Sequence, residues 1–298
     1  MNELQKVEFD LLCEAVKIFS DLKLTYYLVC GSALGAIKYG GFIPWDDDMD
    51  IALPRDDYEI FIKEAGCRLP DGLFLQNHHT EASFPQIFSK LRNSRTTYIE
   101  KSISALPINH GVYIDIFPLD EYPADRGAQR RLEFEKQRLF LKLSVVYCSK
   151  KTGRAALYQH LNRLFHYDRH VHENVERLER VLTCSNGQRS DILCNHGNWQ
   201  GSLEYAPREQ YGDGAWADFE GLRVRVPEKY DDYLTQKYGD WRADLPLEQQ
   251  EGHHYAAVID LHSPFCDYIV KLGKGRIRLK SSEELKQDGI ALQENYQF

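Results

Sequence analysis

The stretch from residue 28 to residue 53, LVCGSALGAIKYGGFIPWDDDMDIAL, constrains the fold of this chain more than any other. An apolar run ends at Gly31-Ser32, and four acids then fall within the five positions 46–50 before the chain turns apolar again. Carboxylates packed this densely repel one another and resist burial unless a cation lies between them. A solvated acidic turn is the alternative explanation. The apolar residues at 42–45 and 51–53 favour a divalent metal site instead.

The spacing of these acids predicts which of them bind the metal. If residues 46–52 are extended, their side chains alternate between two faces, so Asp46, Asp48 and Asp50 share one face and Asp47 lies on the other. A row of carboxylate oxygens suits Mg²⁺ or Mn²⁺. We therefore expect the first three acids to be metal ligands and Asp47 to face away.

Length and composition are those of a globular protein. The 298 residues are enough for one large domain or two ordinary ones, and 43% are hydrophobic against 28% charged. Seven scattered cysteines without CxxC pairs indicate a reducing compartment and no disulfide framework. The first residues lack the apolar core of a signal peptide, so we expect a cytoplasmic protein. The net charge of −8 argues against nucleic-acid binding.

The order of predicted elements indicates a mixed α/β (α+β) fold. Apolar residues at helical spacing predict a helix over residues 3–23, and a buried strand over 25–30 leads through the glycine turn to a short helix at 32–38. The acidic strand, a helix at 54–65 and short strands at 73–76, 86–92 and 96–100 follow.

A further acid, Asp115, lies in the middle of the apolar segment GVYIDIFPLD at 111–120. An unpaired carboxylate is costly in a buried strand, so Asp115 should complete the metal site from a second strand, and it could accept a proton from an attacking hydroxyl. Gly31 has no Cβ and lets the backbone approach a phosphate, to which Ser32 can donate. Together these residues predict phosphoryl transfer.

Residues 126–180 form a basic island, with 13 Lys and Arg against 6 Asp and Glu. Their helical periodicity predicts a basic helical insertion at 126–182, which separates a catalytic core at 1–125 from a C-terminal part at 183–298 that completes the core and the acceptor side. Two hypotheses follow for the insertion: peripheral contact with the anionic inner face of the plasma membrane, or a helical pair that closes over the acceptor cleft.

The segment at 31–59, GSALGAIKYGGFIPWDDDMDIALPRDDYE, resembles the signature of the LicD family of phosphorylcholine transferases, which is related to fukutin-type phosphoalditol transferases. Residues 89–100, 111–120 and, more loosely, 219–241 extend the resemblance. It implies a nucleotidyltransferase (DNA polymerase β-like) fold, with a mixed sheet flanked by helices. It also implies an Mg²⁺- or Mn²⁺-dependent enzyme that moves phosphocholine from a CDP-activated donor to a sugar hydroxyl of a glycan, lipopolysaccharide or teichoic acid precursor and releases CMP.

The same resemblance assigns site residues. It makes Asp46, Asp48, Asp50 and Asp115 the metal-binding and catalytic acids. Gly31 and Ser32 match the phosphate-contacting turn, where the family more often has Gly-Thr. The cations expected near the diphosphate are Lys38, Lys90 and Arg92, for each of which a plain surface cation is the alternative.

Several questions stay open at the level of sequence. The donor alcohol could be choline, glycerol or ribitol, and the same acids would serve a nucleotidyltransferase that attacks an NTP and releases pyrophosphate. A non-catalytic nucleotide-binding module is a third hypothesis, which the presence of all four expected acids disfavours. Two further clusters have no assigned role: a candidate zinc set of Cys184, Cys194 and His196, and the pair His253 and His254.

Overall fold

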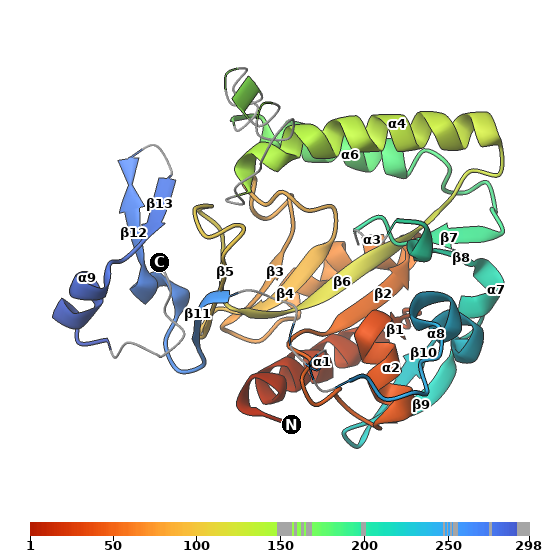
Figure 1. The fold of residues 1–298 in the computed structure, drawn as a ribbon, viewed down its shortest axis with the longest axis horizontal. Coiled ribbons are helices and arrows are strands. Elements are labelled where there is room, and N and C mark those ends of the chain that lie inside the picture. Colours follow the sequence, from red (N-terminus) through yellow and green to blue (C-terminus); the bar gives the residue numbers. More distant parts are fainter. Residues whose placement is uncertain are drawn as a thin grey trace.

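The computed structural model describes residues 1–147, 157, 160–161, 164, 169–197, 201–246, 248, 250, 252, 256–273 and 276–290. A mixed seven-stranded sheet lies at its centre, with the order β1-β2-β6-β4-β3 and with β7 and β8 added beyond β6 (Figure 1). Its strands are β1 (Tyr27–Leu28), β2 (Asp50–Pro54), β3 (Leu73–Gln76), β4 (Ser89–Asn93), β6 (Val112–Glu121), β7 (Ile192–Cys194) and β8 (Tyr205–Pro207). The expected mixed α/β fold is confirmed.

Pairing within the sheet is antiparallel except between β2 and β6, which run parallel. Parallel neighbours require a crossover connection, and here the chain between them forms α3 (Arg55–Glu64) and the strands β3, β4 and β5 (Thr97–Glu100). Strand β6 is buried at every position but its last, which explains the apolar run around Asp115.

The helices against the sheet follow from their sequence patterns. Helix α1 (Glu3–Asp21) begins at an Asn2 and Gln5 capping box and buries Leu11, Ala15 and Phe19 in the main core. Helix α2 (Cys30–Lys38) begins directly after β1, as the glycine turn predicted. The core also contains α8 (Tyr230–Tyr238) and the hairpin of β9 (Ala215–Phe219) and β10 (Leu222–Val226).

The basic insertion forms a helical pair. Helices α4 (Arg126–Leu143) and α6 (Val171–Leu182) run side by side and share a small apolar cluster with Ile87 of the core (Figure 1). Most residues between them, including His166, lie outside the described residues. Among the described residues, no helix combines the length and the apolarity needed to cross a bilayer.

The C-terminal part is joined to the sheet region through β11 (Ala256–Asp260), which pairs with β5. Around Ile99 and Tyr268 it forms a second apolar cluster. The remaining elements are the short helices α7 (Arg208–Tyr211) and α9 (Ser282–Gln287) and the hairpin of β12 (Ile269–Leu272) and β13 (Arg276–Leu279).

Candidate active site

Two of the expected acids lie opposite each other on neighbouring strands. Asp50 of β2 and Asp115 of β6 are register partners in the parallel pair, and the backbone N–H of Asp115 donates to the carbonyl of Met49 at 2.8 Å. Both carboxylates line a cavity of about 550 Å³, a size suited to a small-molecule ligand. The tertiary fold thus brings together acids that are far apart in the sequence.

The other acids precede the strand. We expected residues 46–49 to be extended as part of it, and this prediction is wrong, because β2 begins only at Asp50. The Nε2 of Gln5, on α1, donates to the carbonyls of Ile43 and Asp46 at 3.1 and 3.0 Å, and the N–H of Asp46 donates to the carbonyl of Ile43 at 3.0 Å. These bonds fix a turn at Pro44-Trp45 just before the acids, and residues 46–49 form no regular secondary structure.

The prediction that Asp47 faces away from the other acids holds for the cavity but not for the acidic cluster. Asp46 and Asp48 line the cavity with Asp50 and Asp115, whereas Asp47 does not. One carboxylate oxygen each from Asp46, Asp47 and Asp48 nevertheless lies within 4.8 Å of the other two, so Asp47 belongs to the acidic cluster without facing the cavity. A cluster composed of carboxylate oxygens fits a hard cation such as Mg²⁺ or Mn²⁺.

The glycine-serine turn is placed at the beginning of α2. A Cβ on Gly31 would lie 2.8 Å from Oδ2 of Asp46, so this glycine leaves room for the carboxylate as well as for a ligand. Ser32 is buried, and its Oγ accepts the N–H of Asp50 at 2.8 Å. Ser32 therefore braces the acidic strand, while Gly31 lines the cavity.

The three expected cations have different positions. Lys90 is buried in the cavity wall, with its Nζ 3.1 Å from Oδ1 of Asp115 and 3.5 Å from Oε2 of Glu100. Lys38 also lines the cavity and donates to the carbonyl of Ala243 at 2.7 Å, which ties a C-terminal loop to α2.

Arg92 is fully buried and does not line the cavity. Its guanidinium donates to Oε1 of Gln76 at 2.5 Å and to the carbonyl of Gly111 at 2.6 Å. Its Nη2 also lies 3.4 Å from Oε2 of Glu100, which Lys90 contacts as well, so Arg92 supports the cavity wall from behind without lining it.

Sequence reasoning did not assign many residues of the cavity wall, and five of them bear directly on the chemistry. Glu100 adds a carboxylate from β5, and four aromatic side chains come from segments before and after the acidic motif: Tyr39, Trp45, Tyr238 and Trp241. Each of the five falls inside or beside a segment that carries the family resemblance, which was the available signal. Their convergence required the tertiary fold.

The acids affect the ionisation of neighbouring groups. Burial raises the pKa of the Cys30 thiol well above its usual value, and the charges of Asp50 and Asp48 act in the same direction. Burial alone would lower the pKa of Lys237. The pKa is raised instead, because Cys30, Glu204 and Asp50 act in the opposite direction, and Glu204 pairs with Lys237 at 2.7 Å.

The candidate zinc set is not assembled. Sγ of Cys194 lies 3.3 Å from Nδ1 of His196, and both side chains are buried, whereas Cys184 is exposed and lies beside Ser185. His253 and His254 lie outside the described residues.

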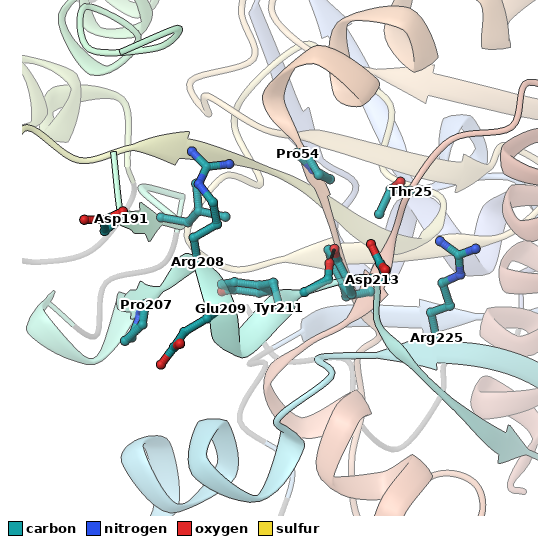
Figure 2. Close-up of a pocket in the computed structure, with 12 residues that line it drawn as sticks. Thr25, Pro54, Asp191, Pro207, Arg208, Glu209, Tyr211, Asp213 and Arg225 are labelled. Carbon is teal, nitrogen blue, oxygen red and sulfur yellow. Dashed lines mark hydrogen bonds between the residues drawn. The ribbon is translucent and has the colours of Figure 1, made fainter. Parts of the chain in front are cut away.

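A second cavity, of about 1020 Å³, lies on another part of the surface (Figure 2). Figure 2 shows its polar wall, with Arg208 and Asp191 at one end and Arg225 with Asp213 at the other. Of the described residues that line it, none belongs to the acidic cluster. The smaller cavity is therefore the candidate active site.

The mixed sheet presents carboxylates from adjacent strands beside the start of a helix, as the expected nucleotidyltransferase-type fold requires. Residues 23–140 match the family model of the LicD/FKTN/FKRP nucleotidyltransferase domain. The matched residues include the segments at 31–59, 89–100 and 111–120, so the resemblance to the LicD family that these motifs predicted is confirmed.

The chain is also similar to a characterised relative, the lipopolysaccharide cholinephosphotransferase LicD of Haemophilus influenzae. The two are 29% identical over 263 residues, which cover 83% of this chain and 90% of the relative. The name of this relative denotes a transferase of phosphorus-containing groups, which is the class of enzyme that the motifs predicted.

Proposed function

We propose that this enzyme transfers phosphocholine from CDP-choline to a sugar hydroxyl of a cell-surface glycan precursor and releases CMP. One observation carries the proposal: a single cavity combines the four acids expected for phosphoryl transfer with aromatic rings suited to a quaternary ammonium. The name of the relative supports choline as the alcohol and lipopolysaccharide as the kind of acceptor.

The acids have distinct roles in this proposal. Asp46, Asp48, Asp50 and Asp115 would hold one or two Mg²⁺ or Mn²⁺ ions. When bound, such an ion neutralises charge on the phosphate oxygens as the P–O bond exchanges. Asp115 also lies where it could accept the proton of the attacking sugar hydroxyl, with Lys90 holding its Oδ1 at 3.1 Å.

The aromatic residues of the wall would recognise the alcohol. The rings of Tyr39 and Trp45 meet edge to face, with their centroids 6.3 Å apart, and Trp241 lies on the other side of Lys38 in the same wall. Aromatic faces attract a quaternary ammonium through their quadrupoles and contribute about 0.5 to 2 kcal/mol each. Glycerol and ribitol carry no such charge and would not benefit.

The test is a donor panel of CDP-choline, CDP-ethanolamine, CDP-glycerol and CDP-ribitol, together with CTP and ATP, incubated with a glycan acceptor and Mg²⁺. We expect CMP release from CDP-choline to exceed that from the other donors and to stop when EDTA is added. Faster CMP release from CDP-glycerol or CDP-ribitol would show that the donor carries that alcohol and not choline. Pyrophosphate from CTP or ATP would identify a nucleotidyltransferase instead.

One variant tests whether the aromatic residues recognise choline, independently of the transfer reaction itself. Trp45→Leu should slow CDP-choline turnover more than CDP-glycerol turnover, because only choline loses a cation–π contact. An equal loss with both donors would contradict a role of Trp45 in choline recognition.

Peripheral membrane contact belongs to the proposal as well. Phe134 and Leu141 are exposed on α4, and the basic residue Arg138 lies between them at helical spacing. Apolar and basic side chains on one exposed helix face suit an anionic bilayer surface. Co-sedimentation with vesicles should increase with the fraction of anionic lipid and should fall for Phe134→Ser. Co-sedimentation that does not depend on anionic lipid would contradict membrane contact and favour the alternative, in which the helical pair closes over the acceptor cleft.

A further inference from the structure

A second group of metal-ligating side chains lies where the helical insertion meets the core. His78 and His79 follow β3, and Glu179 lies on α6. One ligand atom from each of the three lies within 4.8 Å of the other two. None of these residues lines the active-site cavity, and nothing in the proposed reaction uses them.

The Glu179 carboxylate is held in place by other charged groups. Its Oε1 accepts from Nη1 of Arg55 at 3.2 Å, and Arg55 itself makes a double hydrogen bond to Asp120, with both distances 2.8 Å. This leaves Oε2 directed at Nε2 of the buried His78, 3.2 Å away. Neighbours that fix the orientation of a ligand in this way are typical of protein metal sites.

A third imidazole lies next to the first two. The ring centroids of His78 and His79 are 3.9 Å apart, and that of His172 on α6 is 5.9 Å from His78. The Nδ1 of His172 is buried without a hydrogen-bond partner in the described part of the chain, while its Nε2 lies 3.3 Å from Glu176. His172 therefore borders the set of His78, His79 and Glu179 without being part of it.

We propose that His78, His79 and Glu179 bind a zinc ion that fastens α6 to the core. Two imidazole nitrogens and one carboxylate oxygen form a donor set that zinc favours, whereas Mg²⁺ and Mn²⁺ favour the all-carboxylate cluster of the active site. Two ligands about 2.0 to 2.1 Å from a tetrahedral ion lie about 3.3 Å apart. The 3.2 Å between His78 and Glu179 matches that separation.

The zinc ion would have a structural consequence. The two histidines follow a core strand and Glu179 lies in the insertion, so one ion would join segments that are distant in sequence. A protonated His78 that pairs with Glu179 and binds no metal is the competing explanation of the same contact.

The experiment measures metal directly, so it does not depend on the reaction. The full-length protein is stripped with EDTA, dialysed, and titrated with ZnCl₂ and, separately, with CoCl₂. We expect one zinc per chain in excess Mg²⁺, a visible cobalt spectrum of tetrahedral intensity, and a thermal midpoint that rises with zinc. Ligand loss in His79→Ala should weaken zinc binding by about tenfold or more.

The controls separate this site from other metal-binding groups. His79 is exposed, so His79→Ala should fold normally, and circular dichroism verifies this. His170→Ala, which removes an exposed imidazole just before α6, and Asp48→Asn, in the acidic cluster, should both retain zinc. Wild-type protein that binds no zinc, or zinc that is lost in Asp48→Asn and kept in His79→Ala, would overturn the proposal.

Discussion

Asp50 and Asp115 stand side by side on the parallel strands β2 and β6, and Lys90 of the antiparallel strand β4 is the register partner of Asp115 on its other side. Three adjacent strands thus present two carboxylates and one ammonium in a row. Because Nζ of Lys90 is 3.1 Å from Asp115, the cation balances one acid of the row. The carboxylate of Asp50 lines the same cavity as those of Asp46 and Asp48.

Removing the charge of a cluster acid should abolish the reaction. Asp48→Asn and Asp50→Asn keep the shape of the side chain but lose an anionic metal ligand, so we expect turnover to fall to background while the thermal midpoint stays the same or rises, because repulsion is relieved. The measurement is metal-dependent CMP release. Asp56→Asn, an exposed acid at the start of α3, is the matched control and should keep full activity.

Substitution of Asp47 shows whether the metal ligands are all the acids of the acidic cluster or only those that line the cavity. Its carboxylate lies within the acidic cluster but does not line the cavity. We expect Asp47→Asn to retain most of the rate and an unchanged Mg²⁺ requirement in a metal titration of CMP release. A loss as large as that in Asp48→Asn would make Asp47 a ligand too.

Gly31→Ala should damage the site without unfolding the protein. The new Cβ would lie 2.8 Å from Oδ2 of Asp46 and must displace that carboxylate. Misplacing a catalytic group by about 1 Å can cost about 100-fold in rate, so we expect a loss of that order in kcat with an unchanged circular dichroism spectrum. Gly66→Ala, where a Cβ meets no atom within 4 Å, should be harmless; equal rates for the two variants would argue against close packing of Asp46 on Gly31.

Lys90 should contribute to stability as well as to the site. Lys90→Met removes the cation between the buried Asp115 and the half-buried Glu100, and breaking a buried ion pair costs about 3 to 5 kcal/mol. Urea unfolding measures the loss. The exposed Lys63→Met should change the free energy of unfolding little, and a comparable effect of both substitutions would mean that Lys90 is not stabilising.

Stability should fall on acidification because of His110. Burial, together with the Arg92 charge, lowers the pKa of His110 to about 4, below the 6.5 of an exposed histidine. Between these two values the unfolded chain binds more protons, so this contribution is complete above pH 6.5 and is lost as the pH falls toward 4.

The expected loss from this group is about 2 kcal/mol between pH 7 and pH 5. Urea unfolding at both pH values measures it. His110→Gln keeps a donor for the carbonyl of Leu106 and should show a smaller pH dependence than the wild type. An unchanged dependence would mean that other groups cause the acid sensitivity.

Much of the local structure could be predicted from the sequence because it depends on short-range patterns. The apolar spacing of α1, the turn before α2 and the buried run around Asp115 all indicated their elements. The alternation of residues 46–50 also distinguished Asp47 from the acids that line the cavity, although its carboxylate lies close to Asp46 and Asp48. The bonds from Gln5 that fix the turn at 44–45 come from a distant helix, and no local pattern shows them.

The cations show the limit of sequence reasoning. Lys90 and Arg92 lie two positions apart on one strand and looked equivalent, yet only Lys90 lines the cavity. Arg92 instead bonds to Gln76 and to the backbone of Gly111. Which partners surround a side chain depends on the neighbouring strands, and these are set by the order of the sheet.

The sequence by itself identified the acids and Gly31 and indicated phosphoryl-transfer chemistry, because repulsion among carboxylates and the shape of glycine are properties of the residues. Only the tertiary structure decided which groups share the cavity. The parallel pairing of β2 with β6 joins Asp50 to Asp115, and the C-terminal loop brings Trp241 to the same wall. It also places Glu179 beside His78, since contacts between distant segments arise only when the whole core packs.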